Sequence, residues 1–259
     1  MKLDDVKKLQ QKKYRQQFGC FLVEGEHLVL ELEKAAQQDE QWQRSELFVT
    51  ATYEHWRSPF KTHVIGERQM MQIADTKTPP GIVGLVPMPA RGAAAASKPG
   101  ERAIYLHEIQ DPGNLGTILR TLAWFGNFRC LLSPNSVDPF NAKVVRASMG
   151  AIFHVPIEQE VVLESLAPRF ARMACLDMDG DSIGSGAFGD FDCYLFGNEA
   201  RGVPRERLPA LDARAFTIRG GGSIESLNLA TAVNLCIYEL SRSADSLEIP
   251  DRRALKLRR

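Results

Sequence analysis

The sequence predicts a two-part α/β protein whose larger, C-terminal part is built on a parallel β-sheet. Three observations predict this fold. From residue 103 onward, short apolar or β-branched runs alternate with helical patterns at intervals of about twenty to twenty-five residues, which is typical of parallel β-α units. A segment rich in proline, glycine and alanine precedes these units and lacks apolar periodicity, as inter-domain linkers do. The stretch before it, of about ninety residues, is long enough for a small domain.

Each apolar run is expected to form one strand. In the C-terminal part the expected strands are 103–109, 128–132, 152–156, 173–177, 193–196 and 215–218, and a final helix is expected over 226–242. In the N-terminal part, strands are expected over 18–23, 47–50, 62–65 and 81–86, and a helix over 25–36. These elements predict an N-terminal α/β domain (1–88), a linker (89–101) and a C-terminal domain (102–259). Ligands of open parallel sheets bind at the carboxyl ends of the strands, so the loops after the strands are where chemistry is expected.

The charge composition excludes a strong global attraction to nucleic acid. The 259 residues are 44% hydrophobic, and 32 basic residues balance 32 acidic ones. Any RNA-binding surface must therefore be local. One basic candidate lies near the N-terminus, at Lys2, Lys7, Lys8, Lys12, Lys13 and Arg15, and a second lies in the C-terminal tail, at Arg252, Arg253, Lys256, Arg258 and Arg259. Terminal charges of this kind also serve simply to keep a chain end solvated.

The cysteines and the apolar runs bear on the cellular compartment. Five cysteines contain no C-x-x-C pair, which favours neither a zinc site nor a disulfide framework, and indicates thiols in a reducing compartment. The sequence opens with charges rather than the apolar core of a signal peptide, and no apolar run is long enough to cross a bilayer. We therefore expect a cytoplasmic protein without a membrane partner.

The first segment with chemical potential is HEIQDPGNLGTILRTLAWFG, residues 107–126. A turn at Asp111 leads off the strand, and Asn114 is expected to cap the following helix. Gly116 and Arg120 are one helical turn apart, so the guanidinium is expected to lie back over the bare glycine toward Asn114. This would place a fixed cation beside the ligand crevice. An ordinary surface arginine on a capped helix would show the same residues.

The second segment is CYLFGNEARGV, residues 193–203. A buried strand ends at Gly197, where the missing side chain lets the backbone approach a ligand closely. Glu199 follows at the same edge of the sheet as Arg120, and we expect the two to form an ion pair that orients the guanidinium. The alternative is a plain strand-to-helix turn with an exposed glutamate.

The third segment spans residues 215–240, where a strand passes through a glycine-rich turn into a long apolar helix. Ser226 and Asn228 stand where that helix is expected to begin. Both residue types cap helices, and capping is the simpler interpretation. The apolar helix would also bury this polar pair beside whatever occupies the crevice.

Taken together and in this order, the three segments resemble the motifs of the SpoU (TrmH) family of RNA ribose 2′-O-methyltransferases, within the SPOUT superfamily. The pattern N-x-G-x-x-x-R-x-x-A is matched by Asn114, Gly116, Arg120 and Ala123; G-x-E-x-x-G by Gly197, Glu199 and Gly202; and S-L-N by Ser226, Leu227 and Asn228. FLVEGEHL (21–28) and PPGIVG (79–84) are similar, less strongly, to the family's small substrate-binding domain.

The resemblance implies a parallel sheet with a C-terminal trefoil knot, a homodimer, and methyl transfer from S-adenosylmethionine to RNA without a metal. It assigns catalysis to Arg120 together with Asn114, Glu199, Ser226 and Asn228, and cofactor contacts to Gly197, Ile218 and Leu227. Arg120 would act either as a general base or as a cation that stabilises developing charge. Lys12, Lys13 and Arg15 are the candidates for RNA phosphate contacts. The N-terminal domain favours 23S rRNA as the substrate.

Other functions remain open from the sequence. A tRNA 2′-O-methyltransferase and a non-catalytic RNA-binding protein of the same fold would share most of these features. The alternating β-α units and GSGAFG (184–189) also raise a nicotinamide-dependent oxidoreductase. That glycine pattern runs into an expected strand, however, whereas a dinucleotide fingerprint opens a helix.

Overall fold

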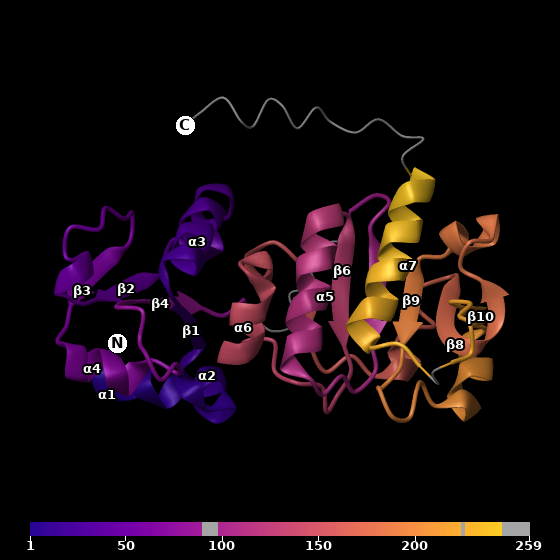
Figure 1. The fold of residues 1–259 in the computed structure, drawn as a ribbon, viewed down its shortest axis with the longest axis horizontal. Helices are drawn as coiled ribbons and strands as arrows, with labels where there is room; N and C mark the ends of the chain where they lie inside the picture. Colours follow the sequence, from indigo (N-terminus) through magenta and orange to yellow (C-terminus); the bar gives the residue numbers. More distant parts are fainter. Residues whose placement is uncertain (90–97, 224–225, 245–259) are drawn as a thin grey trace.

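The described residues of the protein form two β-sheets, which lie side by side along its long axis (Figure 1). The structure, a computed structural model, describes residues 1–89, 98–223 and 226–244. The central part of the expected linker and the basic C-terminal tail (Arg252, Arg253, Lys256, Arg258 and Arg259) lie outside these described residues. The exact domain boundaries therefore stay a prediction.

The N-terminal sheet has the strand order β1-β4-β2-β3. Its strands are β1 (Cys20–Glu24), β2 (Glu46–Val49), β3 (Lys61–Val64) and β4 (Ile82–Pro87), and its helices are α1 (Leu3–Val6), α2 (Lys12–Phe18), α3 (Glu26–Gln38) and α4 (Glu67–Ile73). Strand β4 runs antiparallel to β1 and β2, whereas β3 runs parallel to β2. Figure 1 shows α3 on one side of this sheet and α1, α2 and α4 on the other.

Alternating residues of β4 explain why both faces of this sheet are covered. Ile82 and Val86 belong to the core under α3, whereas Val83 and Leu85 pack with residues of α1 and α4. Successive side chains of a strand point to opposite faces, so a strand that is apolar throughout needs cover on both.

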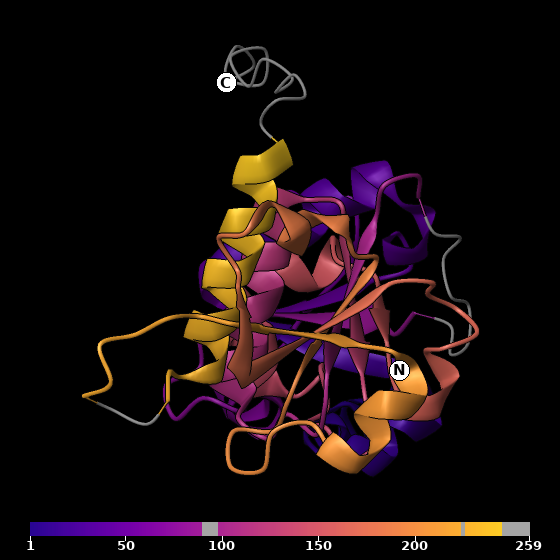
Figure 2. The same ribbon diagram turned by 90° about the vertical axis from the view of Figure 1, so that its right-hand side faces the viewer.

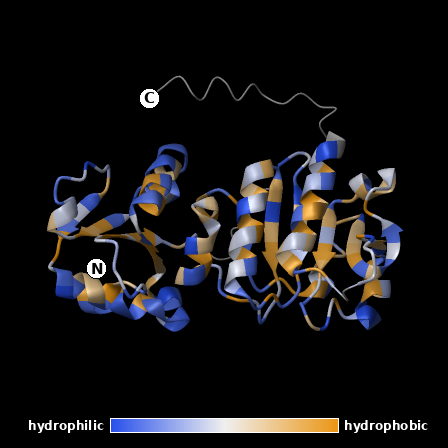
Figure 3. Cartoon of the chain, in the orientation of Figure 1, coloured by the Kyte–Doolittle hydropathy of each residue, from blue (hydrophilic) through white to orange (hydrophobic). Residues whose placement is uncertain are grey.

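The C-terminal sheet has the order β10-β8-β9-β5-β6-β7, and every neighbouring pair is parallel. Its strands are β5 (Arg102–Leu106), β6 (Phe128–Leu132), β7 (Ile157–Glu158), β8 (Met173–Ser182), β9 (Cys193–Phe196) and β10 (Arg214–Thr217), and its α-helices are α5 (Pro112–Phe125), α6 (Ala142–Ser148) and α7 (Leu229–Ala244). The helices lie together on one face (Figure 1), and Figure 3 shows mostly apolar strands beneath helices of mixed polarity. The predicted α/β fold with a parallel sheet is confirmed.

The path of the chain after β10 matters for the site. Strand β10 lies at the outer edge of the sheet, yet α7 packs against α5, so the chain returns across β8 and β9. Figure 2 shows the stretch after β10 reaching away from the body of the protein before α7 begins. Its three glycines, at 220–222, are exposed.

One expected strand was wrong. Residues 152–156 do not form a strand; Ala151–Phe153 form a 3-10 turn, and β7 follows only at Ile157–Glu158. Ile152 and Phe153 are buried against α3 and α5 instead. A short apolar run has the same appearance in a buried turn and in a buried strand, so its periodicity could not distinguish them.

The two parts of the protein share one continuous core. The rings of Phe21 and Phe140 lie 4.9 Å apart, and those of Trp42 and Phe153 lie 5.4 Å apart. Arg15 on α2 forms a buried ion pair with Asp138, at 2.6 Å. Packed rings and a buried ion pair together fix how the N-terminal part sits on the C-terminal part. Among the described residues, no helix is long and apolar enough to cross a membrane.

Candidate active site at the carboxyl edge of the parallel sheet

The cap of helix α5 lies three residues earlier than expected. Pro112 is its first residue, and the Asp111 carboxylate accepts the backbone N–H of Asn114 at 2.7 Å. Asp111 is therefore the N-cap, and the prediction that Asn114 caps this helix was wrong. Proline suits the first helical position because it lacks the N–H that would be unsatisfied there. The consequence is that the Asn114 side chain is available for other contacts.

Two hydrogen bonds join residues from all three predicted segments. Asn114 Nδ2 donates to Glu199 Oε1 at 3.1 Å, and Asn228 Nδ2 donates to Asn114 Oδ1 at 2.9 Å. The three side chains follow β5, β9 and β10, of which β5 and β9 are neighbours in the sheet and β10 lies at its edge, beyond β8. The carboxyl edge of the sheet therefore brings together the polar groups that the sequence predicted there.

This chain of hydrogen bonds has a fixed direction. The Asn228 Oδ1 atom accepts the backbone N–H of Thr231 at 3.2 Å, so Asn228 caps α7. Each amide then donates onward, and the series ends on the Glu199 carboxylate. A negative charge beside the amino-terminal ends of helices is favourable because unpaired N–H groups and the helix dipole point toward it.

Arg120 lies exposed on α5, and the described residues offer it no hydrogen bond or ion pair. The expected Arg120–Glu199 ion pair is not formed, since Glu199 is held by Asn114 instead. Gly116 is not an open position over which the Arg120 side chain lies, because α6 packs against it. A Cβ atom at position 116 would lie only 2.4 Å from Cβ of Ala147, so this glycine lets α5 and α6 pack closely.

The remaining predicted residues occupy the loops around this chain. Gly197 begins a tight turn that needs glycine, because a Cβ atom at this position would lie 2.1 Å from the carbonyl carbon of Gly202. Ile218 is partly buried against the core, and Leu227 is 43% exposed. Ser226 is exposed and precedes the first residue of α7 by three positions, so it does not cap that helix.

Two residues of this edge were missed by the sequence analysis. Asn198 is buried, and its amide donates to the backbone carbonyl of Glu108 at 2.9 Å. Glu108 has a left-handed backbone (φ 48°), which is uncommon outside glycine and asparagine. Asparagine between a glycine and a glutamate is a turn signal that could have pointed to Asn198. No sequence pattern indicates the Glu108 conformation.

A histidine at the end of β5 adds a neutral group to this edge. Partial burial lowers the pKa of His107, and Arg207 and Arg201 lower it further, although the neighbouring Glu108 opposes them. The backbone N–H of His107 also donates to the carbonyl of Phe196 at 2.8 Å, which ties the ends of β5 and β9 together.

The predicted RNA contacts divide into two kinds. Lys12 and Lys13 are exposed on α2, as a phosphate contact requires. Arg15 is 4% exposed, and its guanidinium is occupied by Asp138 and by the backbone carbonyls of Leu9 and Gln10. Arg15 is thus a structural residue between the two parts of the protein, and its assignment as a phosphate contact was wrong.

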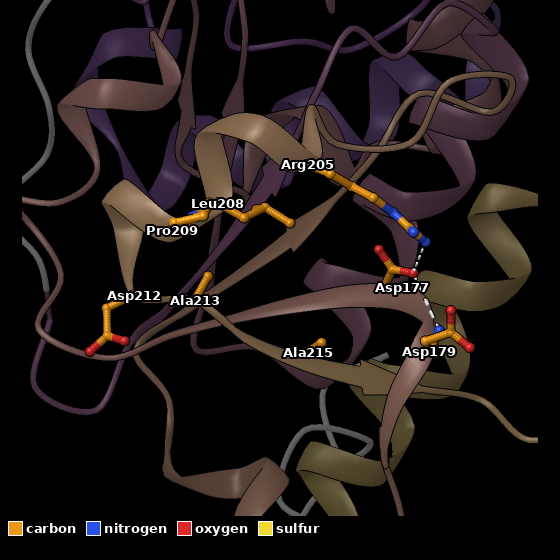
Figure 4. Close-up of a pocket in the computed structure, with 8 residues that line it drawn as sticks. All are labelled: Asp177, Asp179, Arg205, Leu208, Pro209, Asp212, Ala213 and Ala215. Carbon is orange, nitrogen blue, oxygen red and sulfur yellow. Dashed lines mark hydrogen bonds and ion pairs between the residues drawn. The ribbon is translucent and has the colours of Figure 1, made fainter.

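A cavity of about 400 Å³ lies between β8, β10 and the 3-10 helix Arg205–Leu211 (Figure 4). It is lined by Asp177, Asp179, Arg205, Leu208, Pro209, Asp212, Ala213 and Ala215. Arg205 spans it to reach Asp177 at 2.6 Å. None of the predicted catalytic or cofactor residues lines this cavity. The described residues contain no cluster of histidine, cysteine and acidic side chains suited to a metal.

A parallel sheet whose carboxyl edge gathers amide and carboxylate side chains from three loops defines an α/β enzyme with its site at that edge. Comparison with known proteins specifies the family of enzymes. Residues 101–238 match the SpoU rRNA Methylase family, and residues 2–84 match the MRM3-like substrate binding domain. The chain belongs to the SpoU rRNA methylase family, and the resemblance seen in the sequence is confirmed.

Individual relatives agree with this assignment. The chain is 30% identical over 248 residues to the 23S rRNA (guanosine(2553)-2′-O)-methyltransferase RlmP of Bacillus subtilis, covering 92% of this chain and 95% of that protein. A putative RNA methyltransferase of the TrmH family from Porphyromonas gingivalis has a similar structure, with a TM-score of 0.79, 28% identity, and coverage of 93% and 96% of the two chains. An AdoMet-bound rRNA methyltransferase from Sinorhizobium meliloti shares the fold, with a TM-score of 0.77, 24% identity and 95% coverage of each chain.

Proposed function

We propose that this protein transfers a methyl group from S-adenosylmethionine to a ribose 2′-hydroxyl of 23S rRNA. The observation that carries the proposal is the hydrogen-bond chain from Asn228 through Asn114 to Glu199, beside the exposed Arg120. It unites the residues of three family motifs at one edge of the sheet. The full-length similarity to a 23S rRNA 2′-O-methyltransferase supports the choice of RNA.

The loops at this edge fit the cofactor. Leu227 is an exposed apolar side chain and Ile218 a partly buried one, so both offer apolar surface to an adenine ring. Gly197 has no side chain to cover its backbone, to which we assign the polar parts of the molecule. The cofactor supplies a methyl group activated on a positively charged sulfur.

Within this site the residues of the chain hold and orient the RNA. Guanidinium groups stay protonated in proteins, so we assign Arg120 the role of a cation that binds the target phosphate and stabilises negative charge as it develops on the ribose oxygen. The hydroxyl proton leaves to solvent. The amides of Asn114 and Asn228, the hydroxyl of Ser226 and the carboxylate of Glu199 orient the nucleotide for transfer.

Substitution of Arg120 tests this role. Arg120→Ala should lower the rate of methyl transfer by at least about a hundredfold while leaving cofactor affinity within about twofold, because the lost charge acts in the transition state. Arg120→Lys keeps the charge and should retain part of the rate. If Arg120 were a general base instead, the rate of the Lys variant would rise with pH between about 7 and 9 as more of the amine loses its proton, whereas a cationic role predicts a rate that does not rise. Single-turnover transfer of tritiated methyl groups and calorimetry with S-adenosylmethionine would measure both quantities.

The substrate is tested with RNA from a strain that lacks the protein. Purified protein should incorporate tritiated methyl groups into 23S rRNA from the deletion strain but not from the parent strain, at a nucleotide resistant to alkaline hydrolysis. Incorporation into tRNA alone would favour the second candidate, a tRNA 2′-O-methyltransferase. Binding without incorporation into either RNA would indicate a non-catalytic RNA-binding protein.

We further propose that the protein works as a homodimer in the cytoplasm. Helices α5 and α7 expose large apolar side chains, namely Trp124 (67% exposed), Phe125 (36%), Leu235 (41%) and Tyr238 (57%), and Trp124 is one helical turn from Arg120. Apolar patches of this kind are typical of protein interfaces. Five free thiols, four of them buried, suit a reducing compartment. Light scattering would give the molecular mass in solution.

The proposal also includes a trefoil knot and a local RNA contact. The return of the chain from the edge strand β10 to α5 supports a knotted path, which tracing in a crystal structure would test. Lys12 and Lys13 are exposed and support a phosphate contact at α2, whose contribution to RNA affinity should fall as salt rises.

A further inference from the structure

The loop that carries Glu199 is tied to the loop after β5 by two contacts with one residue, Glu108. Asn198 Nδ2 donates to the Glu108 backbone carbonyl at 2.9 Å, and the Arg201 guanidinium pairs with the Glu108 carboxylate at 2.5 Å. The Glu108 loop leads directly into α5 and thus into Asn114. The two loops that are joined in this way are the ones whose side chains meet in the Asn114–Glu199 hydrogen bond.

The Asn198 side chain also shapes its own loop. Its Oδ1 atom accepts the backbone N–H groups of Ala200 and Arg201, at 3.0 and 3.2 Å. The backbone of Asn198 pairs with that of Gly202 in both directions, at 3.2 and 2.8 Å. The loop of residues 198–202 is therefore closed by hydrogen bonds of Asn198, whose side chain is buried. Glu199 is the next residue of this loop.

The Glu108 end of these contacts is equally constrained. The left-handed backbone at Glu108 is unfavourable for this residue type, and it is held by the hydroxyl of Ser133, which accepts the Glu108 N–H at 2.6 Å. Its carbonyl accepts a second hydrogen bond, from Gln110 Nε2 at 3.1 Å. Gln110 is exposed, and its amide donates to this carbonyl and to that of Asn135, at 2.7 Å, but to no described residue of the Glu199 loop, which makes it a matched control for Asn198.

We propose that Asn198, assisted by Arg201, is a positioning residue that clasps the loop after β9 to Glu108 and thereby holds the Glu199 carboxylate against Asn114. The kinetic part of this proposal rests on the proposed methyl transfer, whereas the geometric part does not. Asn198 acts only through Glu199, so its effect should vanish where the carboxylate is already absent.

The decisive variant is Asn198→Asp, which keeps an acceptor for the loop N–H groups but replaces the donor to Glu108 with a repelling oxygen. It should lower kcat about tenfold with KM for RNA nearly unchanged, because a misplaced group loses rate rather than binding. In a Glu199→Gln background the same change should alter kcat by less than about twofold. Gln110→Glu makes the same replacement on the same carbonyl and should leave kcat within about twofold.

A second measurement needs no activity. In protein labelled with ¹⁵N at asparagine, Glu199→Gln should shift the side-chain amide resonance of Asn114, since the two are in direct contact. That shift should be lost when Asn198→Asp is already present and kept when Gln110→Glu is present. If the wild-type protein transfers no methyl group but the variants show these resonance shifts, the proposed function is refuted. The proposed positioning of Glu199 by Asn198 is then still supported.

Arg201→Gln provides a variant that should fold regardless, because this side chain is 71% exposed. It removes the weaker tie and should lower kcat about two- to threefold, again only while Glu199 is present. The proposal is overturned if Asn198→Asp slows the Glu199→Gln enzyme as much as the wild type, if Gln110→Glu matches its effect, or if Arg201→Gln acts independently of Glu199.

Discussion

Neutral amide side chains connect the loops of this site. The sequence indicated Asn114, Glu199 and Asn228 as neighbours at one sheet edge, and the structure confirms that they are in contact. It did not indicate which of them touch, and the expected Arg120–Glu199 ion pair is absent from the described residues. Residue type and strand order determine which groups reach an edge. Which donor meets which acceptor depends on caps and turn shapes that a motif does not encode, such as Asp111 in place of Asn114.

Burial determines the chemistry of the cysteines at this same scale. Burial raises the pKa of Cys175 and of Cys236 to about 12, and it raises those of Cys130 and Cys193 strongly as well. Raised pKa values favour the thiol over the reactive thiolate, so these groups should be inert at pH 8. We expect a thiol reagent to titrate at most one cysteine quickly in the native protein, the half-buried Cys20, and all five in guanidinium chloride. Two or more fast native thiols would contradict this description of the core.

At the scale of elements, most strands and helices were predictable because burial repeats along them. The bounds of β6 and β9 were confirmed to the residue, and other strands and helices shifted by a few residues at their ends. The predictions failed where the local structure depends on a single residue or a single contact. Residues 152–156 form no strand, because a 3-10 turn ends at Phe153 and the next strand begins only at Ile157, and Gly116 proved to be a contact between helices rather than an open surface. Close helix packing depends on a partner, here Ala147, that is distant in the sequence.

Gly116→Ala tests the contact between α5 and α6. The added methyl group would overlap Ala147, and overpacking of this kind lowers the free energy of unfolding by about 1–3 kcal/mol. Gly186→Ala is the control, because a Cβ atom there meets no other atom within 4 Å and the backbone is not left-handed. Urea denaturation of both variants would show a lower midpoint for position 116 alone. Equal stability of the two would mean that the helices separate without penalty.

At the scale of the whole molecule, the sequence predicted two parts and a linker but not how the parts sit together. Their contact depends on pairs such as Arg15–Asp138 and Trp42–Phe153, whose members belong to different parts. Arg15 lies in a basic run that resembled a nucleic-acid contact, and only the fold reveals its buried partner. The candidate RNA contact is thereby reduced to Lys12 and Lys13, and the orientation of that surface relative to the active site is set by a structural arginine.

The buried ion pair between Arg15 and Asp138 should matter for stability because each charge is unfavourable in the core without its partner. Arg15→Met alone leaves Asp138 buried and unpaired, which lowers the free energy of unfolding by about 3–5 kcal/mol. The double substitution Arg15→Met with Asp138→Leu removes both charges and should recover most of that loss. Because one core spans both parts, every variant should unfold in a single transition by calorimetry. Two separate transitions, or additive losses in the double variant, would contradict the shared core.

The separation of Arg15 and Asp138 in the sequence also bears on how the protein is made. The two residues are 123 positions apart, so the amino-terminal part leaves the ribosome well before its partner carboxylate has been synthesised. Domains generally fold as they emerge, from the amino terminus onward. Until residue 138 follows, this part carries an uncompensated guanidinium on the face meant for its neighbour. Its docking is consequently a late event in biosynthesis, and a chain truncated before Asp138 would present that charged face to the chaperones of the cell.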